Sequence, residues 1–193
     1  MHLALFDFDG TISTKDSTWD FITRACGKPR ALYGFIRLSP VFLAYQLKRI
    51  SHHEAKQAII RDYFGDWDKG AFVKAAQRYA RCIVPTIIRG DALKRIHWHL
   101  HRGHTVAVVT GSLDVLLSDW CDSMGLDLIA TGIDLDSACI GLSTRNCFKE
   151  EKARRITEKY TLEGFESISA YGDSKGDREM LALADRQYYK RFD

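Results

Sequence analysis

Residues 1–13 read MHLALFDFDGTIS, and the interpretation of the whole chain begins with this stretch. His2 to Phe8 is a short apolar run that ends in turn residues, which predicts a buried β-strand. Asp7 and Asp9 lie at its end, and side chains two residues apart on a strand point to the same side. Two carboxylates on one side repel each other. The pair therefore needs either free solvation or a cation.

Other apolar runs and the segments between them indicate the fold class. Three further strands are predicted, at Thr105 to Val109, Asp127 to Ala130 and Ser167 to Tyr171, and QYYKRF after Asp185 is interpreted as a last strand. Helical patterns separate the strands, at Asp91 to Arg102, Leu113 to Met124, Glu150 to Tyr160 and Lys175 to Ala184. This alternation predicts an α/β fold, with a parallel sheet flanked by helices on both faces.

A long segment without a convincing strand, Asp16 to Thr86, separates the first strand from the second. Its turn signals divide it into helices: Gly27-Lys28-Pro29 breaks one, Ser51-His52-His53-Glu54 is a capping box that begins another, and Gly65 to Asp68 ends that helix. We expect residues 16–86 to form a helical cap domain and residues 1–15 and 87–193 to form the core domain. Ile133 to Leu142 is predicted to be a hairpin.

Composition narrows the classes of function. The chain has 193 residues and a formal charge of +3, which is too small and too evenly spread to indicate a nucleic-acid partner. Five scattered cysteines without a C-x-x-C pair predict reduced thiols and a cytoplasmic location. No secretory signal is expected at the start, and no stretch reaches the roughly 18 apolar residues of a membrane span.

Polar residues follow the other predicted strands as well. Thr110-Gly111-Ser112 comes after the second strand, and Gly172-Asp173-Ser174-Lys175-Gly176-Asp177 comes after SISAY. In an open parallel sheet, ligands bind outside the carboxyl ends of the strands. Three strand ends are therefore expected to bring carboxylates, a hydroxyl and glycine-rich turns to one edge.

Such a cluster suits phosphoryl transfer. Mg²⁺ prefers oxygen ligands and is commonly bound by a few carboxylates together with substrate phosphate. An aspartate that attacks phosphorus gives an aspartyl-phosphate, and Asp9 is placed to donate a proton to the leaving alcohol. Thr110 and the amides around Gly111 can bind phosphate oxygens, and Lys152 is available to complete the set.

With these residues, the sequence resembles the phosphatases of the haloacid dehalogenase superfamily, subfamily IB, which is the group that includes phosphoserine phosphatase. Four motifs carry the resemblance in the family's order: D-F-D-G-T (Asp7 to Thr11), V-V-T-G-S (Val108 to Ser112), K-E-E-K (Lys149 to Lys152) and G-D-S-K-G-D (Gly172 to Asp177). The resemblance covers essentially the whole chain. It implies a Rossmann-like core with an inserted helical cap of the C1 type.

The resemblance also implies a role for each matching residue. Asp7 resembles the nucleophile, and Asp9 resembles the general acid/base, whose backbone carbonyl also reaches Mg²⁺. Thr110 and Lys152 resemble the phosphate-binding pair, and Asp173 resembles the third metal ligand. Asp177 resembles a residue that contacts the metal through water or steadies Lys152. Gly111 and Ser112 belong to the same substrate-binding turn. Lys149 is a rival for the lysine role, but Lys152 is preferred because K-E-E-K resembles the family's G-E-E-K pattern, in which glycine is common at the position of Lys149.

Asp16 is an informative departure from that pattern. It occupies the position at the start of the cap where phosphoserine phosphatases resemble one another in carrying a glutamate that meets the substrate amine. The shorter side chain disfavours phosphoserine, although Asp16 is equally well explained as a helix cap. The G-D-S-K-G-D form and the apolar stretch 31–47 (ALYGFIRLSPVFLAYQL) resemble the branch that contains phosphatidylglycerophosphatase C-like enzymes. That likeness suggests a lipid-linked phosphate and peripheral contact with a membrane surface.

Several alternatives remain open from the sequence. A phosphotransferase or mutase would use the same residues, and a phospho-accepting signalling module also combines Asp, Thr and Lys, but it lacks the second carboxylate and the cap. Lys152 could be an ordinary solvated helix lysine. The run from His97 to His101, with His104, is interpreted as a solvated helix face rather than a zinc site. The leading prediction is a Mg²⁺-dependent phosphatase that acts on a small or lipid-linked phosphate monoester.

Overall fold

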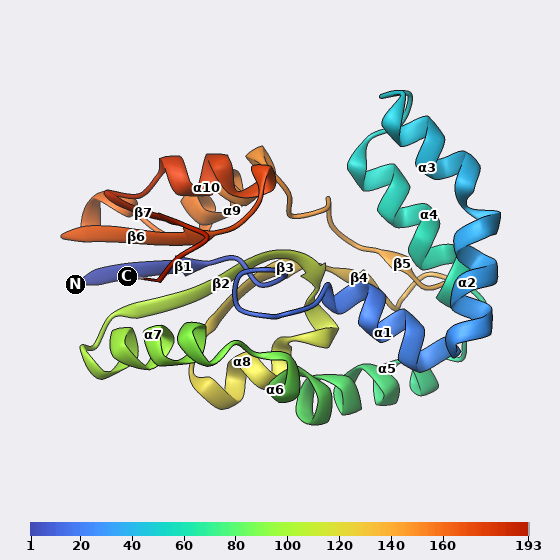
Figure 1. Ribbon diagram of the computed structural model, residues 1–193, viewed down its shortest axis with the longest axis horizontal. Coiled ribbons are helices and arrows are strands. Elements are labelled where there is room, and N and C mark those ends of the chain that lie inside the picture. Colours follow the sequence, from blue (N-terminus) through green and yellow to red (C-terminus); the bar gives the residue numbers. More distant parts are fainter. Residues whose placement is uncertain (193) are drawn as a thin grey trace.

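The centre of the molecule is a parallel β-sheet (Figure 1). This computed structural model describes residues 1–192. Its five strands lie in the order β3-β2-β1-β6-β7, and each neighbouring pair is parallel. Their bounds are β1 His2–Phe6, β2 Thr105–Leu113, β3 Asp127–Thr131, β6 Ser167–Gly172 and β7 Arg186–Tyr189. The predicted α/β fold is confirmed.

Alternating side chains of β1 pack on opposite faces of the sheet. Ala4 and Phe6 belong to one buried apolar cluster, and Leu3 and Leu5 belong to the other. All four are fully buried, as expected for the central strand of a sheet that is covered on both faces. Figure 1 shows α7 (Gly90–His101) and α8 (Ser118–Met124) on one side, and α9 (Glu150–Lys159) and α10 (Arg178–Ala182) on the other.

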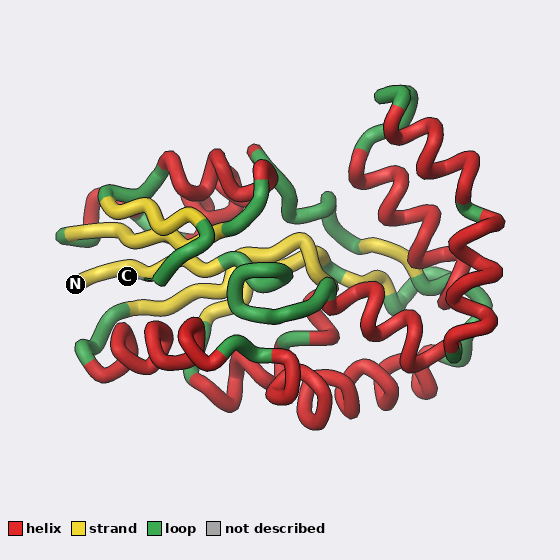
Figure 2. The backbone as a smooth tube through the Cα atoms, in the orientation of Figure 1, coloured by secondary structure: helices red, strands yellow, loops and turns green. Residues whose placement is uncertain are grey.

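Helices fill the segment between β1 and the helix α7 (Figure 2). They are α1 Ser17–Cys26, α2 Lys28–Arg37, α3 Ser39–Gln46, α4 His52–Phe64, α5 Lys69–Arg78 and α6 Val84–Ile87, with a π-helical turn at Tyr79–Ile83. The predicted breaks are present, since α1 ends before Gly27 and α4 begins at a capping box formed by Ser51 and Glu54. The larger apolar cluster runs without interruption from the sheet into these helices. The division into a cap of residues 16–86 and a core domain stays a prediction.

Several predicted boundaries were wrong. The first strand ends at Phe6 rather than Phe8, and β2 continues through Thr110 to Leu113. The helix predicted to begin at Leu113 begins at Ser118, after a 3-10 turn, and the one predicted over Lys175 to Ala184 is a 3-10 turn followed by the short helix α10. Polar residues interrupt the apolar pattern at these points, so apolar periodicity places the boundaries poorly.

Two remaining predictions concern short or polar segments. The hairpin is present as the antiparallel pair β4 (Ile133–Asp134) and β5 (Gly141–Leu142). His97 and His101 are exposed, but His99 is 3% exposed, so its assignment to a solvated face was wrong. Within residues 1–192, no helix combines the length and apolar character needed to cross a bilayer.

Candidate functional site

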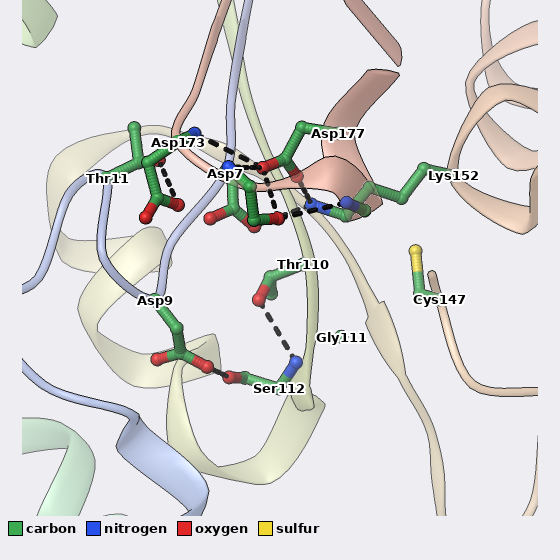
Figure 3. Close-up of polar contacts among 12 residues, drawn as sticks. Asp7, Asp9, Thr11, Thr110, Gly111, Ser112, Cys147, Lys152, Asp173 and Asp177 are labelled. Atoms are coloured by element: carbon green, nitrogen blue, oxygen red, sulfur yellow. Dashed lines mark hydrogen bonds and ion pairs between the residues drawn. The ribbon is translucent and has the colours of Figure 1, made fainter. Parts of the chain in front are cut away.

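The ends of three adjacent strands meet at one place. β1 lies between β2 and β6, so the loop that begins at Asp7, Thr110 in the last part of β2 and the loop that begins at Asp173 are neighbours. Figure 3 shows the carboxylates of Asp7 and Asp177 directed toward Lys152, with Thr110 beside them and Asp9 lower on the same loop as Asp7. The parallel sheet thus places together residues that are far apart in the sequence.

Lys152 joins two of these carboxylates. Its Nζ donates to Asp7 Oδ1 at 2.5 Å and to Asp177 Oδ1 at 2.6 Å. The lysine is 2% exposed, and these two carboxylates raise the pKa of its ammonium group against the effect of burial. Lys149 is exposed and lies over the ring of Phe148. The geometry therefore places Lys152 rather than Lys149 at the strand ends.

Asp177 is held on both of its oxygens. Oδ1 accepts from Lys152, and Oδ2 accepts from the backbone amide of Ser174 at 2.9 Å and from the Ser174 hydroxyl at 2.8 Å. Burial opposes ionisation, but Lys152 and these hydrogen bonds hold the pKa of Asp177 below its usual range. Asp177 is therefore a fixed anion that orients Lys152.

Three carboxylates form a group that can hold a cation. Oxygens of Asp7, Asp173 and Asp177 all lie within 4.8 Å of one another. Gly10 has a φ of +84°, and a Cβ at this position would lie 2.5 Å from Asp173 Oδ2, so only glycine lets the loop pass so close. Thr11 donates to Asp173 Oδ1 at 3.2 Å.

The charges at this point are unbalanced, because one lysine faces three carboxylates. Burial raises the pKa of Asp7 to about 7, although Lys152 acts to lower it. A divalent cation would offset the excess negative charge and favour the ionised form of Asp7. Oxygen ligands of this kind fit Mg²⁺.

Asp9 has different partners. Its Oδ1 accepts from the backbone amide of Ser17 at 2.8 Å, and its Oδ2 accepts from the Ser112 hydroxyl. The Ser17 and Ser112 hydroxyls are themselves 2.6 Å apart. Burial, with a smaller contribution from Asp16, raises the pKa of Asp9 to about 6. A carboxyl group with that pKa can give and take a proton near neutral pH.

The last residues of β2 border the same space. Thr110 Oγ1 accepts from the backbone amide of Ser112 at 3.0 Å, and Thr110 and Gly111 line a cavity of about 360 Å³ together with Asp7 and Asp9. Ser112 is buried behind Asp9 and is not among the lining residues. Ser112 was predicted to bind substrate, but its side chain contacts Asp9 and does not line the cavity.

Helices form the opposite wall of the cavity. Trp19, Phe42, Tyr45, His52 and Ile59 contribute apolar and aromatic surface, and Phe148 stacks on the His52 ring with centroids 4.2 Å apart. Asp16 also lines the cavity, but its carboxylate accepts from the backbone amide of Trp19 at 2.9 Å as the N-cap of α1. One end of the cavity is thus charged, and the other is largely apolar.

Lys56 and Ser17 are among the polar residues of the site that were missed in the sequence. Lys56 lines the cavity and donates to the backbone carbonyl of Gly111, and burial lowers the pKa of its ammonium group. Ser17 contacts Asp9. A signal for Lys56 was its position on α4 between Ala55 and Ile59, on the apolar side of the helix. No signal marks Ser17, whose place depends on how α1 packs against β2.

Comparisons with known proteins agree with this arrangement. Residues 4–182 match the family of haloacid dehalogenase-like hydrolases. Protein CicA of Caulobacter vibrioides is 32% identical over 194 residues, which covers 98% of this chain and 86% of that protein.

Two solved structures show the same fold. A protein of unknown function from Bordetella pertussis Tohama I has a TM-score of 0.79 at 21% identity, over 96% of this chain and 88% of that one. A phospho-aspartyl intermediate analogue of phosphoserine phosphatase has a TM-score of 0.65 at 20% identity, over 96% and 84% of the two chains. The family match spans most of the sequence, and on that ground this chain belongs to the haloacid dehalogenase-like hydrolases.

Proposed function

We propose that the protein is a Mg²⁺-dependent phosphomonoester hydrolase that forms an aspartyl-phosphate on Asp7. The observation that carries this proposal is the position of Asp7 in the charged end of the cavity, with its Oδ1 2.5 Å from Lys152 Nζ. A buried carboxylate beside a cation is suited to approach a phosphate dianion. The phosphoserine phosphatase structures of the same fold support the reaction class.

The reaction proceeds in two displacements at phosphorus. An Asp7 oxygen attacks the phosphorus atom, the bond from phosphorus to the alcohol oxygen breaks, and Asp9 gives its proton to the leaving oxygen. Water then attacks the phosphorus of the aspartyl-phosphate and passes a proton to Asp9, which releases phosphate and restores Asp7. The Thr110 hydroxyl and Lys152 donate to the phosphate oxygens.

The cation site belongs to the same proposal. Asp7, Asp173 and Asp177, with the backbone carbonyl of Asp9, would hold Mg²⁺ through direct bonds or through bound water. When bound, Mg²⁺ neutralises charge on the phosphate and on the carboxylates. Thr11 fixes the orientation of Asp173.

The apolar wall of the cavity bears on the substrate. Phosphoserine carries an amine and a carboxylate, whereas the wall opposite Asp7 is built largely from aromatic and aliphatic side chains. Asp16 is engaged as a helix cap, which leaves it less able to meet a substrate amine. These features favour a phosphate monoester with an apolar alcohol, including a lipid-linked one, over phosphoserine.

Hydrolysis of p-nitrophenyl phosphate tests the reaction. We expect turnover with Mg²⁺, loss of activity after EDTA treatment, and a decrease in kcat of at least about 10³-fold in Asp7→Asn, because the amide cannot replace the nucleophile. Asp66→Asn is the matched control, since Asp66 is exposed in the loop between α4 and α5. Equal rates for Asp7→Asn and the wild-type protein would contradict the proposal.

A further inference from the structure

The outer surface of α2 and α3 exposes many large apolar side chains. Five of them define what we call the apolar tip: Leu32, Tyr33 and Ile36 on α2, Leu43 on α3, and Leu47 directly after it. Their exposed fractions range from 55% to 63%. Figures 1 and 2 place these helices at the outer edge of the molecule, far from both termini. A concentration of exposed apolar side chains in so short a segment marks an interaction site.

The two helices are unusual for the surface of a globular protein. α2 packs its inner side on α4, where the Tyr63 hydroxyl donates to the Ala31 carbonyl at 2.6 Å and Gly34 contacts the Tyr63 ring. Its outer side would ordinarily be polar, but it carries the apolar tip. α3 has the sequence SPVFLAYQ, and its inner side packs half-buried Val41 and Phe42 against the core, although none of its residues is fully buried. Its outer side leaves Leu43 exposed.

The charged residues of the segment that carries the apolar tip are all basic. Residues 21–53 contain six lysines and arginines and no aspartate or glutamate. Arg24 and Arg37 form ion pairs with Asp20 and Asp62, which lie outside that range. Exposed cations without an ion-pair partner among residues 1–192 remain at both ends of the α2–α3 segment: Lys28, Arg30, Lys48 and Arg49.

We propose that the apolar tip docks on the surface of an anionic lipid bilayer. Apolar side chains would enter the boundary between headgroups and acyl chains, while the four basic residues contact the anionic headgroups. A second copy of the chain fits this surface poorly, because a symmetric contact brings the same cations together and residues 21–53 offer no acidic partner. The contact is peripheral, since no helix within residues 1–192 can span a membrane.

Aromatic rings connect the docking surface to the cavity. Phe35 of α2 contacts Phe42 of α3 with ring centroids 5.0 Å apart, and Trp19 of α1 lies 6.0 Å from Phe35. Phe42, Trp19 and Tyr45 also line the cavity that ends at Asp7. On the basis of the proposed phosphatase activity, the bilayer would supply a phosphate monoester whose alcohol is a lipid, with its acyl chains along this aromatic path.

Vesicle flotation tests the docking directly. We expect the wild-type protein to float with vesicles of equal parts phosphatidylglycerol and phosphatidylcholine, and to bind pure phosphatidylcholine vesicles less well. Added salt should weaken the binding, because it screens the contact between cations and headgroups. Leu32→Gln/Leu43→Gln should lower the vesicle partition coefficient by about tenfold. Lys28→Gln/Arg49→Gln should lower it by a similar factor, and only on anionic vesicles.

Matched variants outside α2 and α3 control for general effects. Trp98→Gln/Tyr189→Gln removes two exposed aromatic side chains, and Lys74→Gln/Arg78→Gln removes two exposed cations of α5. Both should bind as the wild-type protein does. Failure of the wild-type protein to float, or equal losses in the tip and control variants, would overturn the proposal. So would self-association that the tip substitutions abolish while vesicle binding persists.

Docking and catalysis are tested separately. Asp7→Asn should bind vesicles like the wild-type protein, so a failed phosphatase assay leaves the docking result intact. The Leu32→Gln/Leu43→Gln variant should hydrolyse p-nitrophenyl phosphate at the wild-type rate, which also shows that it is folded. With phosphatidic acid embedded in vesicles as the probe, the same variant should lose about tenfold in rate at low lipid concentration. Equal rates on embedded phosphatidic acid would refute a role for the docking surface in substrate access.

Discussion

The two ends of the cavity differ in how their groups are satisfied. At the strand ends, Lys152 contacts two carboxylates, and Asp9 accepts two hydrogen bonds. Beyond the opposite wall, the apolar tip leaves large apolar side chains exposed and nearby cations unpaired within residues 1–192. We infer that the charged end is stabilised by contacts within the chain, whereas the apolar tip is covered by a partner outside the chain.

The charged end holds the residues proposed for the reaction, whereas the apolar tip holds the residues proposed for binding to the bilayer. The charged end is set by strand ends whose positions relative to one another are fixed by the sheet register. The outer end is set by short helices that pack on one another. Substitutions in the two regions should therefore have different consequences for activity, stability and binding.

Removing the cation at the charged end should have the largest effect on stability. Lys152→Met leaves Asp7 and Asp177 buried beside each other without their common partner, and we expect a loss of about 3–5 kcal/mol in the free energy of unfolding in metal-free buffer. Because Mg²⁺ would replace the missing charge, added Mg²⁺ should restore part of that stability. Urea denaturation with EDTA and with Mg²⁺ measures both effects.

Lys149→Met is the matched control for this prediction. Lys149 lies three residues away, is exposed and has no ion pair among the described residues. We expect little change in stability and no added dependence on Mg²⁺. If Lys149→Met were as destabilising as Lys152→Met, the assignment of Lys152 to the charged end would be wrong.

Much of the charged end was predictable from the sequence, because its residues follow apolar strands. Asp7 and Asp173 come directly after β1 and β6, Thr110 lies in the last part of β2, and a parallel sheet brings these strand ends to one edge. The helical segment was also predictable, because Gly27 and the Ser51 capping box punctuate it. Strand and helix boundaries were less accurate where polar residues interrupt the apolar periodicity, as at residues 110–112, which continue β2.

The rest of the site depends on packing between elements. Lys56 and Ser17 reach the cavity and Asp9 only because α4 and α1 lie against the end of β2. The exposure of Leu32 and Ile36 could not be read from composition either, because the apolar stretch 31–47 is equally compatible with buried packing. Tertiary contacts decide which apolar residues are inside.

The packing that holds α2 can be tested at one position. Gly34→Ala would place a Cβ 2.5 Å from Tyr63 Cζ, and Tyr63 is 1% exposed and donates to the Ala31 carbonyl. The gain in helix propensity is about 1 kcal/mol, but we expect overpacking to exceed it and to lower the free energy of unfolding by about 1–3 kcal/mol. Thermal unfolding followed by circular dichroism measures the change.

Gly90→Ala is the control for Gly34→Ala. A Cβ at Gly90, the first residue of α7, meets nothing within 4 Å. This substitution should be neutral or slightly stabilising. If Gly34→Ala behaved in the same way, α2 would not depend on its close contact with α4, and the apolar tip would be free to shift.

The smallest effect on stability is expected from a substitution of His99, the buried histidine that was wrongly assigned to a solvated face. His99 Nε2 lies 2.9 Å from the Tyr171 hydroxyl, and Nδ1 lies 2.8 Å from His104 Nδ1. Burial lowers the pKa of His99 to about 3, and four nearby cationic or titratable groups act in the same direction: His104, Arg95, His2 and Arg102. The folded protein therefore keeps this ring neutral at pH values where the unfolded chain protonates it.

That difference makes stability depend on pH. Between the unfolded pKa of about 6.5 and the folded pKa of about 3, the unfolded state binds the extra proton, so stability falls as the pH falls. The contribution is at most about 1.4 kcal/mol per pH unit. Urea denaturation at pH 7.5, 6.5 and 5.5 should show a shallower loss in His99→Gln than in the wild-type protein, whereas His97→Gln, at an exposed position of the same helix, should keep the wild-type slope. Parallel slopes for His99→Gln and the wild-type protein would mean that His99 is charged, or free to become charged, in the folded state.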